Sequence, residues 1–310
     1  MKKLATVRVD EVKVPTTYSL EQTGITQGLT ADFATCRQRF LFRINGWRQM
    51  EQFSEPLFFG SLVHHLLEEL YKSQSKLFSA VIPKLIRLYA AKHAPDVDPV
   101  LLLKAEALMT VYCEVFTKEQ VFPIRTEEVF ATPALGVMLR GRKDLVYKNK
   151  FGKKWMKEHK TKSQIDHEFL GYQLSHDIQN FFYDLSEEVE HGSPFVGITY
   201  NILKRPMHRP KKEETEVEFL QRLKTEIRKN SGDFFFRYEV IFTKQDRARF
   251  RGELELKIFE MKEYLAGRLG HYRNEAACLI PYRCQFLRAC SSGYMTGYQK
   301  SKIIFPELEE

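Results

Sequence analysis

Residues 137–160 of the chain read VMLRGRKDLVYKNKFGKKWMKEHK, and this stretch decides the fold. Its apolar residues predict two strands, over 137–147 and 154–160, and the polar segment 148–152 between them is typical of a hairpin turn. Asp144 and Glu158 would then lie on adjacent antiparallel strands. Because side chains alternate between the two faces of a strand, we expect Glu158 and Lys160 to point one way and His159 the other.

Two carboxylates and a lysine on neighbouring strands are the groups that hold a divalent metal against a phosphodiester. Asp144 and Glu158 would be direct ligands and the backbone carbonyl of His159 a third, since Mg²⁺ prefers oxygen donors. Lys160 would orient the attacking water or stabilise the developing charge. The hairpin alone leaves an alternative open, in which these are ordinary charges on a solvated sheet edge.

The rest of the chain surrounds this hairpin with helices and further strands. Before it, apolar spacing predicts helices over 31–42 (with Thr30 as N-cap), 61–73, 77–93 and 100–117. After it, we expect helices over 175–190, 215–229 and 244–269, and strands over 197–203 and 233–242. The sequence has no flexible linker or low-complexity segment, which favours a single domain over 1–310. Within it we expect a helical N-terminal part at 30–125, a catalytic core at 126–242, and a C-terminal helix with a cysteine-bearing tail at 243–310.

Composition narrows the class of protein. The chain has 310 residues, of which 43% are hydrophobic and 28% charged, as in an ordinary folded domain rather than a disordered chain. The net charge of +8 favours an anionic partner, either nucleic acid or an acidic membrane face. The N-terminus lacks the apolar stretch of a signal peptide, and no segment approaches the roughly 18 apolar residues of a membrane span. We therefore expect a cytoplasmic protein with no membrane partner.

Three further residues lie on predicted helices from which their side chains could reach the hairpin. His64 lies on a predicted helix beside an apolar face, where an imidazole can contact a metal held by neighbouring strands. Gln179 and Tyr183 are four apart on another helix, where an amide and a phenol can contact a base or a phosphate. For each of these residues, a packed position at the edge of the core is the simpler alternative.

The order of these motifs resembles a known family. Gly60-Ser61-Leu62-Val63-His64, Gly141-Arg142-Lys143-Asp144, Glu158-His159-Lys160-Thr161 and the pair Gln179 and Tyr183 follow one another as in the PD-(D/E)XK nuclease superfamily. The chain is most similar to its RecB-like exonuclease branch, which includes many phage-encoded nucleases. The resemblance spans about residues 30 to 290. One departure is His159, where the family more often has an apolar residue.

The resemblance implies an α/β fold, with a central mixed β-sheet flanked by helices (a restriction-endonuclease-like core) and helical insertions. It also implies that His64, Asp144 and Glu158 bind Mg²⁺ or Mn²⁺ and that Lys160 is catalytic. Gln179 and Tyr183 would then support substrate binding.

The cysteines resemble a second element of the same branch. In several of its nucleases one early cysteine joins three late ones around an iron–sulfur cluster, and here Cys36 precedes Cys278, Cys284 and Cys290. Four thiolates are the number that a [4Fe-4S] cluster needs. Both gaps between the late cysteines are five residues, whereas the branch usually has two and then five. Zinc and metal-free buried thiols are the alternatives.

We therefore expect a metal-dependent DNA nuclease, an exonuclease acting on ends of single- or double-stranded DNA in recombination, repair or phage DNA processing. The alternative is a DNA-binding subunit of a recombination complex that keeps the fold without cutting. A recombination protein as partner and a homo-oligomer are both compatible with the sequence, and a phage-encoded chain would act in the host cytoplasm. Strand polarity, endonucleolytic action and RNA as substrate stay open.

Overall fold

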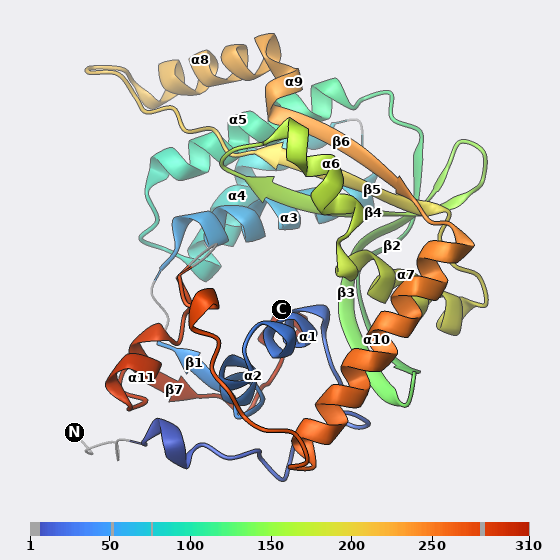
Figure 1. Cartoon of the computed structure of the whole chain (residues 1–310). Coiled ribbons are helices and arrows are strands. Elements are labelled where there is room, and N and C mark those ends of the chain that lie inside the picture. Colours follow the sequence, from blue (N-terminus) through green and yellow to red (C-terminus); the bar gives the residue numbers. More distant parts are fainter. Residues whose placement is uncertain (1–6, 51–52, 76, 280–282, 310) are drawn as a thin grey trace.

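A five-stranded mixed sheet forms the centre of the protein, as the resemblance implied (Figure 1). The computed structural model describes residues 7–50, 53–75, 77–279 and 283–309. The strand order is β2-β3-β4-β5-β6, and only β4 and β5 are parallel. The bounds of the strands are Val121–Ala134 (β2), Val137–Asn149 (β3), Lys154–Lys162 (β4), Gly197–Lys204 (β5) and Phe235–Ile241 (β6).

The predicted hairpin of β3 and β4 is confirmed. Tyr147 pairs with Trp155 and Leu145 with Lys157, and Asn149 closes the turn by accepting hydrogen bonds from the backbone of Phe151 and Lys153. Parallel neighbours need a crossover connection, and here α6 (His167–Ser175) and α7 (Ile178–His191) provide it between β4 and β5.

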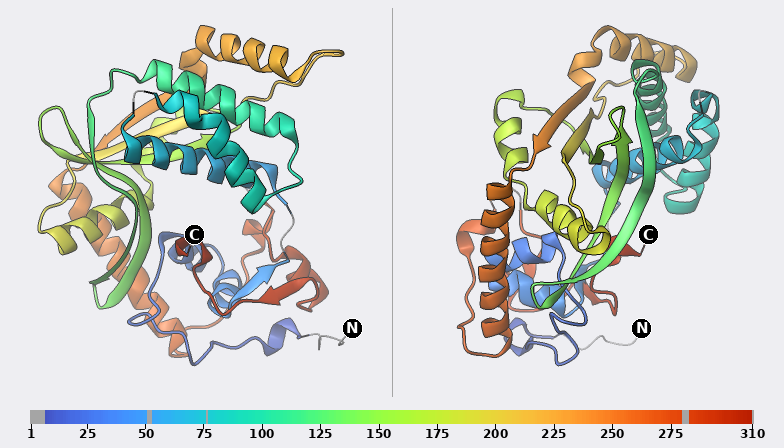
Figure 2. Two further views of the ribbon diagram at one scale, coloured as in Figure 1. Left: turned by 180° about the vertical axis from the view of Figure 1, so that it is seen from behind. Right: turned by 90° about the vertical axis from the view of Figure 1, so that its right-hand side faces the viewer.

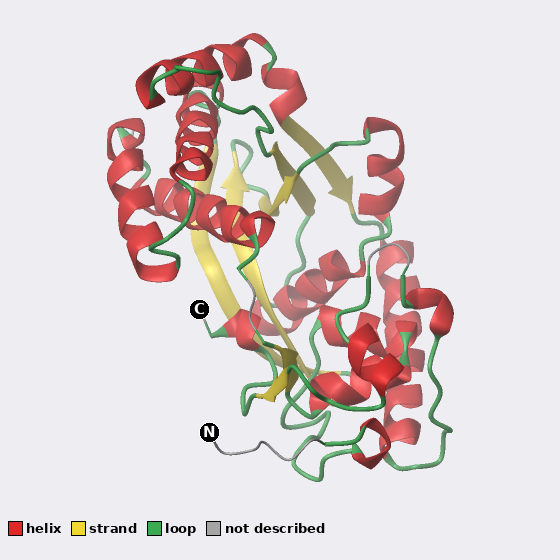
Figure 3. Cartoon of the chain, turned by 90° about the vertical axis from the view of Figure 1, so that its left-hand side faces the viewer, coloured by secondary structure: helices red, strands yellow, loops and turns green. Residues whose placement is uncertain are grey.

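The sheet has a hydrophobic core on each of its two faces. Because side chains alternate along a strand, each strand contributes buried residues to both cores. Leu145 and Trp155 face one group of helices, whereas Val146 and Met156 face the other. The first group consists of α3 (Glu55–Ser73), α4 (Phe78–His93), α5 (Pro99–Val115) and α8 (Glu216–Lys229), which lie together on one side in Figures 1 and 3. The second core includes α7 and the long α10 (Lys244–Leu265).

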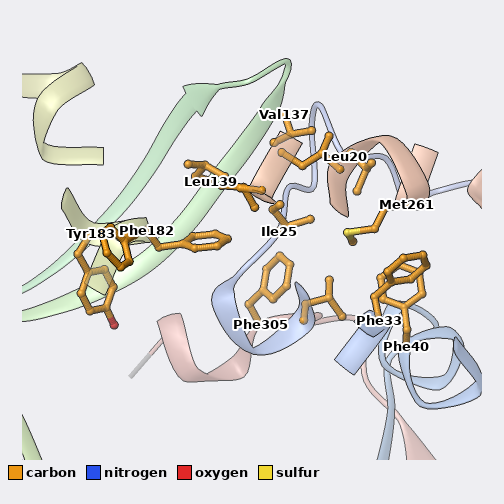
Figure 4. Close-up of a cluster of buried hydrophobic side chains, with 14 of the residues drawn as sticks. Leu20, Ile25, Phe33, Phe40, Val137, Leu139, Phe182, Tyr183, Met261 and Phe305 are labelled. Atoms are coloured by element: carbon orange, nitrogen blue, oxygen red, sulfur yellow. The ribbon is translucent and has the colours of Figure 1, made fainter. Parts of the chain in front are cut away.

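Segments from both ends of the chain form a lobe at the far end of the β2–β3 hairpin (Figure 2). The lobe contains α1 (Gln27–Thr35), α2 (Arg37–Ile44), α11 (Leu287–Ser292), and a two-stranded sheet of β1 (Trp47–Gln49) and β7 (Tyr298–Lys300). Figure 4 shows Leu20 and Ile25 beside Val137 and Leu139 of β3, with Phe305 below Ile25, so that residues from both ends of the chain share one buried cluster with this strand.

The remaining short elements are α9 (Ser231–Phe234) and the 3₁₀ turns Val9–Glu11, Glu275–Ala277 and Pro306–Leu308. In the part of the chain that the structure describes, no helix combines the length and apolarity that crossing a membrane requires.

Three helices begin at other residues than predicted, and the helix expected over 244–269 ends at Leu265. The helix expected over 31–42 is two helices, because Cys36 is extended (φ −162°, ψ 116°) and Thr26 rather than Thr30 caps the first one. The helix expected from Ser61 begins at Glu55, with Pro56 in its first turn, where a missing N–H costs nothing. The helix expected over 175–190 begins at Ile178, since the Asp177 side chain caps it by accepting from the Gln179 N–H.

Candidate active site

Glu158 and Lys160 lie on the same face of β4, as alternation predicts, and Gln179 of α7 holds both. Lys160 Nζ donates to Glu158 Oε1 and to Gln179 Oε1, both at 2.8 Å. Gln179 Nε2 donates to the same Glu158 oxygen at 2.9 Å and also to the Tyr183 hydroxyl. One amide therefore fixes the acid, the lysine and the phenol relative to one another.

The position of Gln179 follows from the start of α7. Asp177 caps the helix through one carboxylate oxygen, which accepts from the Gln179 N–H at 3.0 Å. Its other oxygen accepts from the Tyr200 hydroxyl of β5, also at 3.0 Å. The cap thus ties the first turn of α7 to the sheet that carries Glu158.

Asp144 lies on β3 beside the backbone of His159 and the ring of His64. Its Oδ2 accepts from the His159 N–H at 2.7 Å and lies 3.7 Å from Nδ1 of His64, which belongs to α3. The structure therefore brings His64, Asp144 and the backbone N–H of His159 together.

The His159 ring points to the opposite face of β4 from Glu158 and Lys160, as alternation predicts. It stacks on Tyr71 (5.8 Å between centroids, 14° between planes), and its Nδ1 accepts from Asn201 Nδ2 at 2.9 Å. Burial first, and then the charge of His64, lower its pKa well below the ordinary value. The ring is thus a neutral part of the core, and only the backbone of His159 faces the site.

Glu127, which the sequence did not single out, is a further member of the site. Ligand atoms of Glu127, His64 and Asp144 lie within 4.8 Å of one another, close enough to share one metal ion. Glu127 has a φ of 46° inside β2, a conformation that residues other than glycine rarely adopt. The pairing of Thr126 with Leu145 and of Glu128 with Lys143 places Glu127 opposite Asp144. Its place opposite Asp144 depends on the register between β2 and β3, which no local pattern in the sequence gives.

Electrostatics in the site are dominated by buried carboxylates. Burial and the charge of Asp144 raise the pKa of Glu158 to about 7. Burial also raises the pKa of Asp144 and of Glu127, the latter further because of the Asp144 charge. Burial alone would lower the pKa of Lys160, but the charges of Glu158 and Asp177 raise it, so Lys160 is protonated at neutral pH.

The donor set fits a divalent cation. Burying several carboxylates together is unfavourable unless a cation compensates for their charge. Arg142 contacts Glu127 at 3.0 Å, but Glu158 Oε2 is buried and has no hydrogen-bond partner among the described residues. A bound metal would satisfy this oxygen and lower the repulsion between the acids. Glu158 does not belong to the closely spaced group of Glu127, His64 and Asp144. Its other oxygen accepts from Lys160 and Gln179.

The four cysteines singled out in the sequence line one cavity of about 200 Å³ in the lobe. Cys36 sits at the break between α1 and α2, where its sulfur accepts from the Asn274 N–H at 3.5 Å. The Cys284 N–H donates to the Cys278 carbonyl at 2.8 Å, and Cys290 belongs to α11. Cys113 lies elsewhere, in α5, and burial raises its pKa to about 11.

Comparisons with known proteins agree with this architecture. A protein of Eubacterium rectale, named a putative exonuclease, has a similar solved structure, with 11% identity over 85% of this chain and 86% of that chain and a TM-score of 0.50. The solved structure of SSO0001 gives 15% identity over 75% of this chain and 84% of that chain, but its TM-score of 0.31 is too low to support an argument. No curated protein sequence matches the chain. The family model of the PD-(D/E)XK nuclease superfamily matches residues 27–291, and the chain therefore belongs to this superfamily.

Proposed function

We propose that the chain is a Mg²⁺- or Mn²⁺-dependent deoxyribonuclease that removes nucleotides from DNA ends. The observation that carries the proposal is the joint bonding of Glu158, Lys160 and Gln179 beside a buried Asp144. An ordinary charged hairpin edge would face water and would need no such clamp. The membership in a nuclease superfamily supports cleavage of a phosphodiester by these groups.

In this proposal Asp144, Glu158 and the His159 carbonyl hold the metal, and His64 and Glu127 complete its surroundings. A bound divalent cation supplies positive charge to the scissile phosphate and lowers the pKa of a coordinated water. Lys160, which is protonated at neutral pH, donates hydrogen bonds where negative charge develops and does not act as a base. Gln179 keeps its ammonium in place, and Tyr183 supports that amide from α7.

Digestion of linear DNA with and without Mg²⁺ tests the enzyme proposal. Asp144→Asn should lower the rate by about 10²–10³-fold or more, because it removes a charged group that acts in the transition state. Asp96→Asn, on an exposed residue, is the matched control and should leave the rate unchanged. If the wild-type protein binds DNA but degrades none with either metal, the alternative of a non-catalytic DNA-binding subunit is correct.

Action on ends is the finer part of the proposal. It is supported by the resemblance to the RecB-like exonuclease branch and by the name of the similar protein from Eubacterium rectale. An exonuclease should digest linear DNA and spare covalently closed circles, whereas cutting of circles would show endonucleolytic action. Roles in recombination, repair or phage DNA processing, in the cytoplasm and with a recombination protein as partner, agree with such an activity.

We further propose that Cys36, Cys278, Cys284 and Cys290 hold a [4Fe-4S] cluster. The support is that thiols more than 200 residues apart in the sequence line one small cavity. Such a cluster would join α1 and α2 to the C-terminal tail, and a metal clip across a long loop can stabilise the fold strongly. Iron, sulfide and zinc analysis of anaerobically purified protein separates a cluster from zinc and from metal-free thiols.

A further inference from the structure

A cavity lies beyond Lys160 at the end of β4. It has a volume of about 610 Å³, within the usual range of about 300–1,000 Å³ for ligand sites. Thr161, Lys162 and Ser163 line it, as do Pro56 at the start of α3 and Leu170 of α6. The strand that carries Glu158 and Lys160 thus runs directly into this cavity, and the helix that carries His64 begins at its wall.

Lys162 shares the face of β4 that Glu158 and Lys160 occupy. Alternate residues of a strand point the same way, with a rise of about 3.3 Å per residue, so Lys162 follows Lys160 about 7 Å further along. A strand of DNA with its scissile phosphate near Lys160 would bring a neighbouring phosphate to Lys162. The geometry of β4 therefore offers a second cationic position in line with the candidate active site.

Arg205 supplies a second cation at the same edge. Its backbone N–H donates to the Lys162 carbonyl at 2.8 Å, which fixes the two residues side by side. Its side chain is only 15% exposed, and its ion pair with the exposed Glu55 is long, at 3.9 Å. No carboxylate of the described residues lies within 4.0 Å of the Lys162 ammonium. Lys162 therefore has no carboxylate partner among the described residues, and Arg205 has a long ion pair with an exposed acid that an anion could replace.

Neighbouring charges strengthen the preference for an anion. Burial lowers the pKa of Lys104, and the charge of Arg205 lowers it further, with Arg209 adding to the effect. Asp166 is the acid that lines the cavity, but one of its oxygens accepts from the N–H groups of Glu168 and Phe169 and caps α6. Among the residues that line the cavity, Lys162 and Arg205 are the two cations and Asp166 is the one acid, so the lining itself carries a net positive charge.

We infer that this cavity binds the terminal nucleotide of the DNA strand being cut, with its terminal phosphate against Lys162 and Arg205. The apolar Pro56 and Leu170 would contact the sugar and base, as the walls of single-strand binding grooves do. The inference rests on the proposed nuclease function and adds a preference for phosphorylated ends. A cavity of limited volume would also make the products short.

Binding without cleavage tests this inference. Fluorescently labelled single-stranded octanucleotides with a 5′ phosphate, a 3′ phosphate or neither are titrated with the full chain in EDTA, and anisotropy gives the dissociation constants. One of the two phosphorylated forms should bind about tenfold or more tightly than the unphosphorylated one, as hydrogen bonds to charged groups predict. Lys162→Gln and Arg205→Gln should each reduce this preference about tenfold, whereas Lys150→Gln, at the exposed hairpin turn, should retain it.

Two results would overturn the inference: equal binding of all three oligonucleotides by the wild-type chain, or an unchanged preference in both Lys162→Gln and Arg205→Gln. Thermal melting by circular dichroism shows whether Arg205→Gln remains folded. If Arg205→Gln does not remain folded, the end preference of Lys162→Gln, at a half-buried position, decides the result alone. A wild-type chain that prefers one phosphorylated end but degrades no DNA with Mg²⁺ or Mn²⁺ would refute the proposed function and leave the inference about the cavity standing.

Discussion

Replacing Gln179 by methionine tests whether this residue positions the catalytic groups. Methionine has a similar length but can neither donate to Glu158 nor accept from Lys160, so two hydrogen bonds of 2.9 and 2.8 Å are lost. A hydrogen bond to a charged group contributes about 1.5–3 kcal/mol. Because Lys160 and Glu158 still contact each other, we expect a loss of about 2–3 kcal/mol in transition-state stabilisation. This corresponds to a kcat about 30- to 150-fold lower.

The expected split between kcat and DNA affinity makes this prediction specific. Gln179 bonds the acid and the lysine, so Gln179→Met should lower kcat and leave the dissociation constant for DNA within about twofold, as for an interaction made in the transition state. Single-turnover release of an end label in Mg²⁺ gives the rate, and anisotropy in EDTA gives the affinity. Gln221→Met, on the exposed surface of α8, is the matched control. A variant that cuts at the wild-type rate but binds DNA more weakly would refute the positioning role and return Gln179 to the substrate-binding role that the family resemblance implied.

Three further predictions concern other parts of the molecule. Glu127→Gln should weaken Mn²⁺ binding about 10- to 100-fold, as loss of a partner near a metal does, in an electron paramagnetic resonance titration; unchanged affinity would exclude Glu127 from the site. Cys290→Ser should abolish the brown colour and the absorbance near roughly 400 nm of anaerobically purified protein, whereas Cys113→Ser should keep both; a colourless, iron-free wild type would contradict the cluster. Burial raises the pKa of Glu187, but hydrogen bonds from Lys154 and Arg125 outweigh this and lower it to about 2, so its stabilisation is complete above about pH 4.5 and is lost as the pH falls toward 2. Glu187→Gln should therefore destabilise the protein by roughly 3–5 kcal/mol at neutral pH and by less at pH 3 in denaturant titrations, and an equal loss at both would contradict this reading.

The hairpin and most of its chemistry could be predicted from the sequence, because both depend on local patterns. Alternation along β4 sets the faces of Glu158, His159 and Lys160, and the spacing of the motifs indicates which helices carry His64 and Gln179. The spacing of apolar residues also predicted β5, β6 and α8. The mixed sheet followed from the resemblance, since the order of strands depends on contacts that no local pattern contains.

The rest could not be predicted because it depends on contacts between distant segments. Cys36 is extended and separates α1 from α2, but the residues on both sides of it have helical spacing, so the sequence predicts one helix. The Cys36 sulfur accepts from the N–H of Asn274, which lies far away in the sequence. Glu127 lies in β2, before the stretch that predicts the hairpin, and its left-handed conformation has no signature in the residue type. The hydrogen bonds of Gln179 to Glu158 and Lys160 join α7 to β4. The spacing of apolar residues predicts each element but not the contacts between them.

The pairing of β1 with β7 has a consequence for the order of folding. Trp47 pairs with Lys300, and Arg37 donates to the Gly270 carbonyl, so these contacts join residues more than 200 positions apart. Contacts of such long range slow folding, whereas the β3–β4 hairpin closes a short loop. The hairpin that carries Asp144 and Glu158 can therefore form early. The cysteine-lined cavity can form only after α11, near the end of the chain, has packed against α1 and α2. Any cofactor in that cavity would have to enter at the final stage of folding.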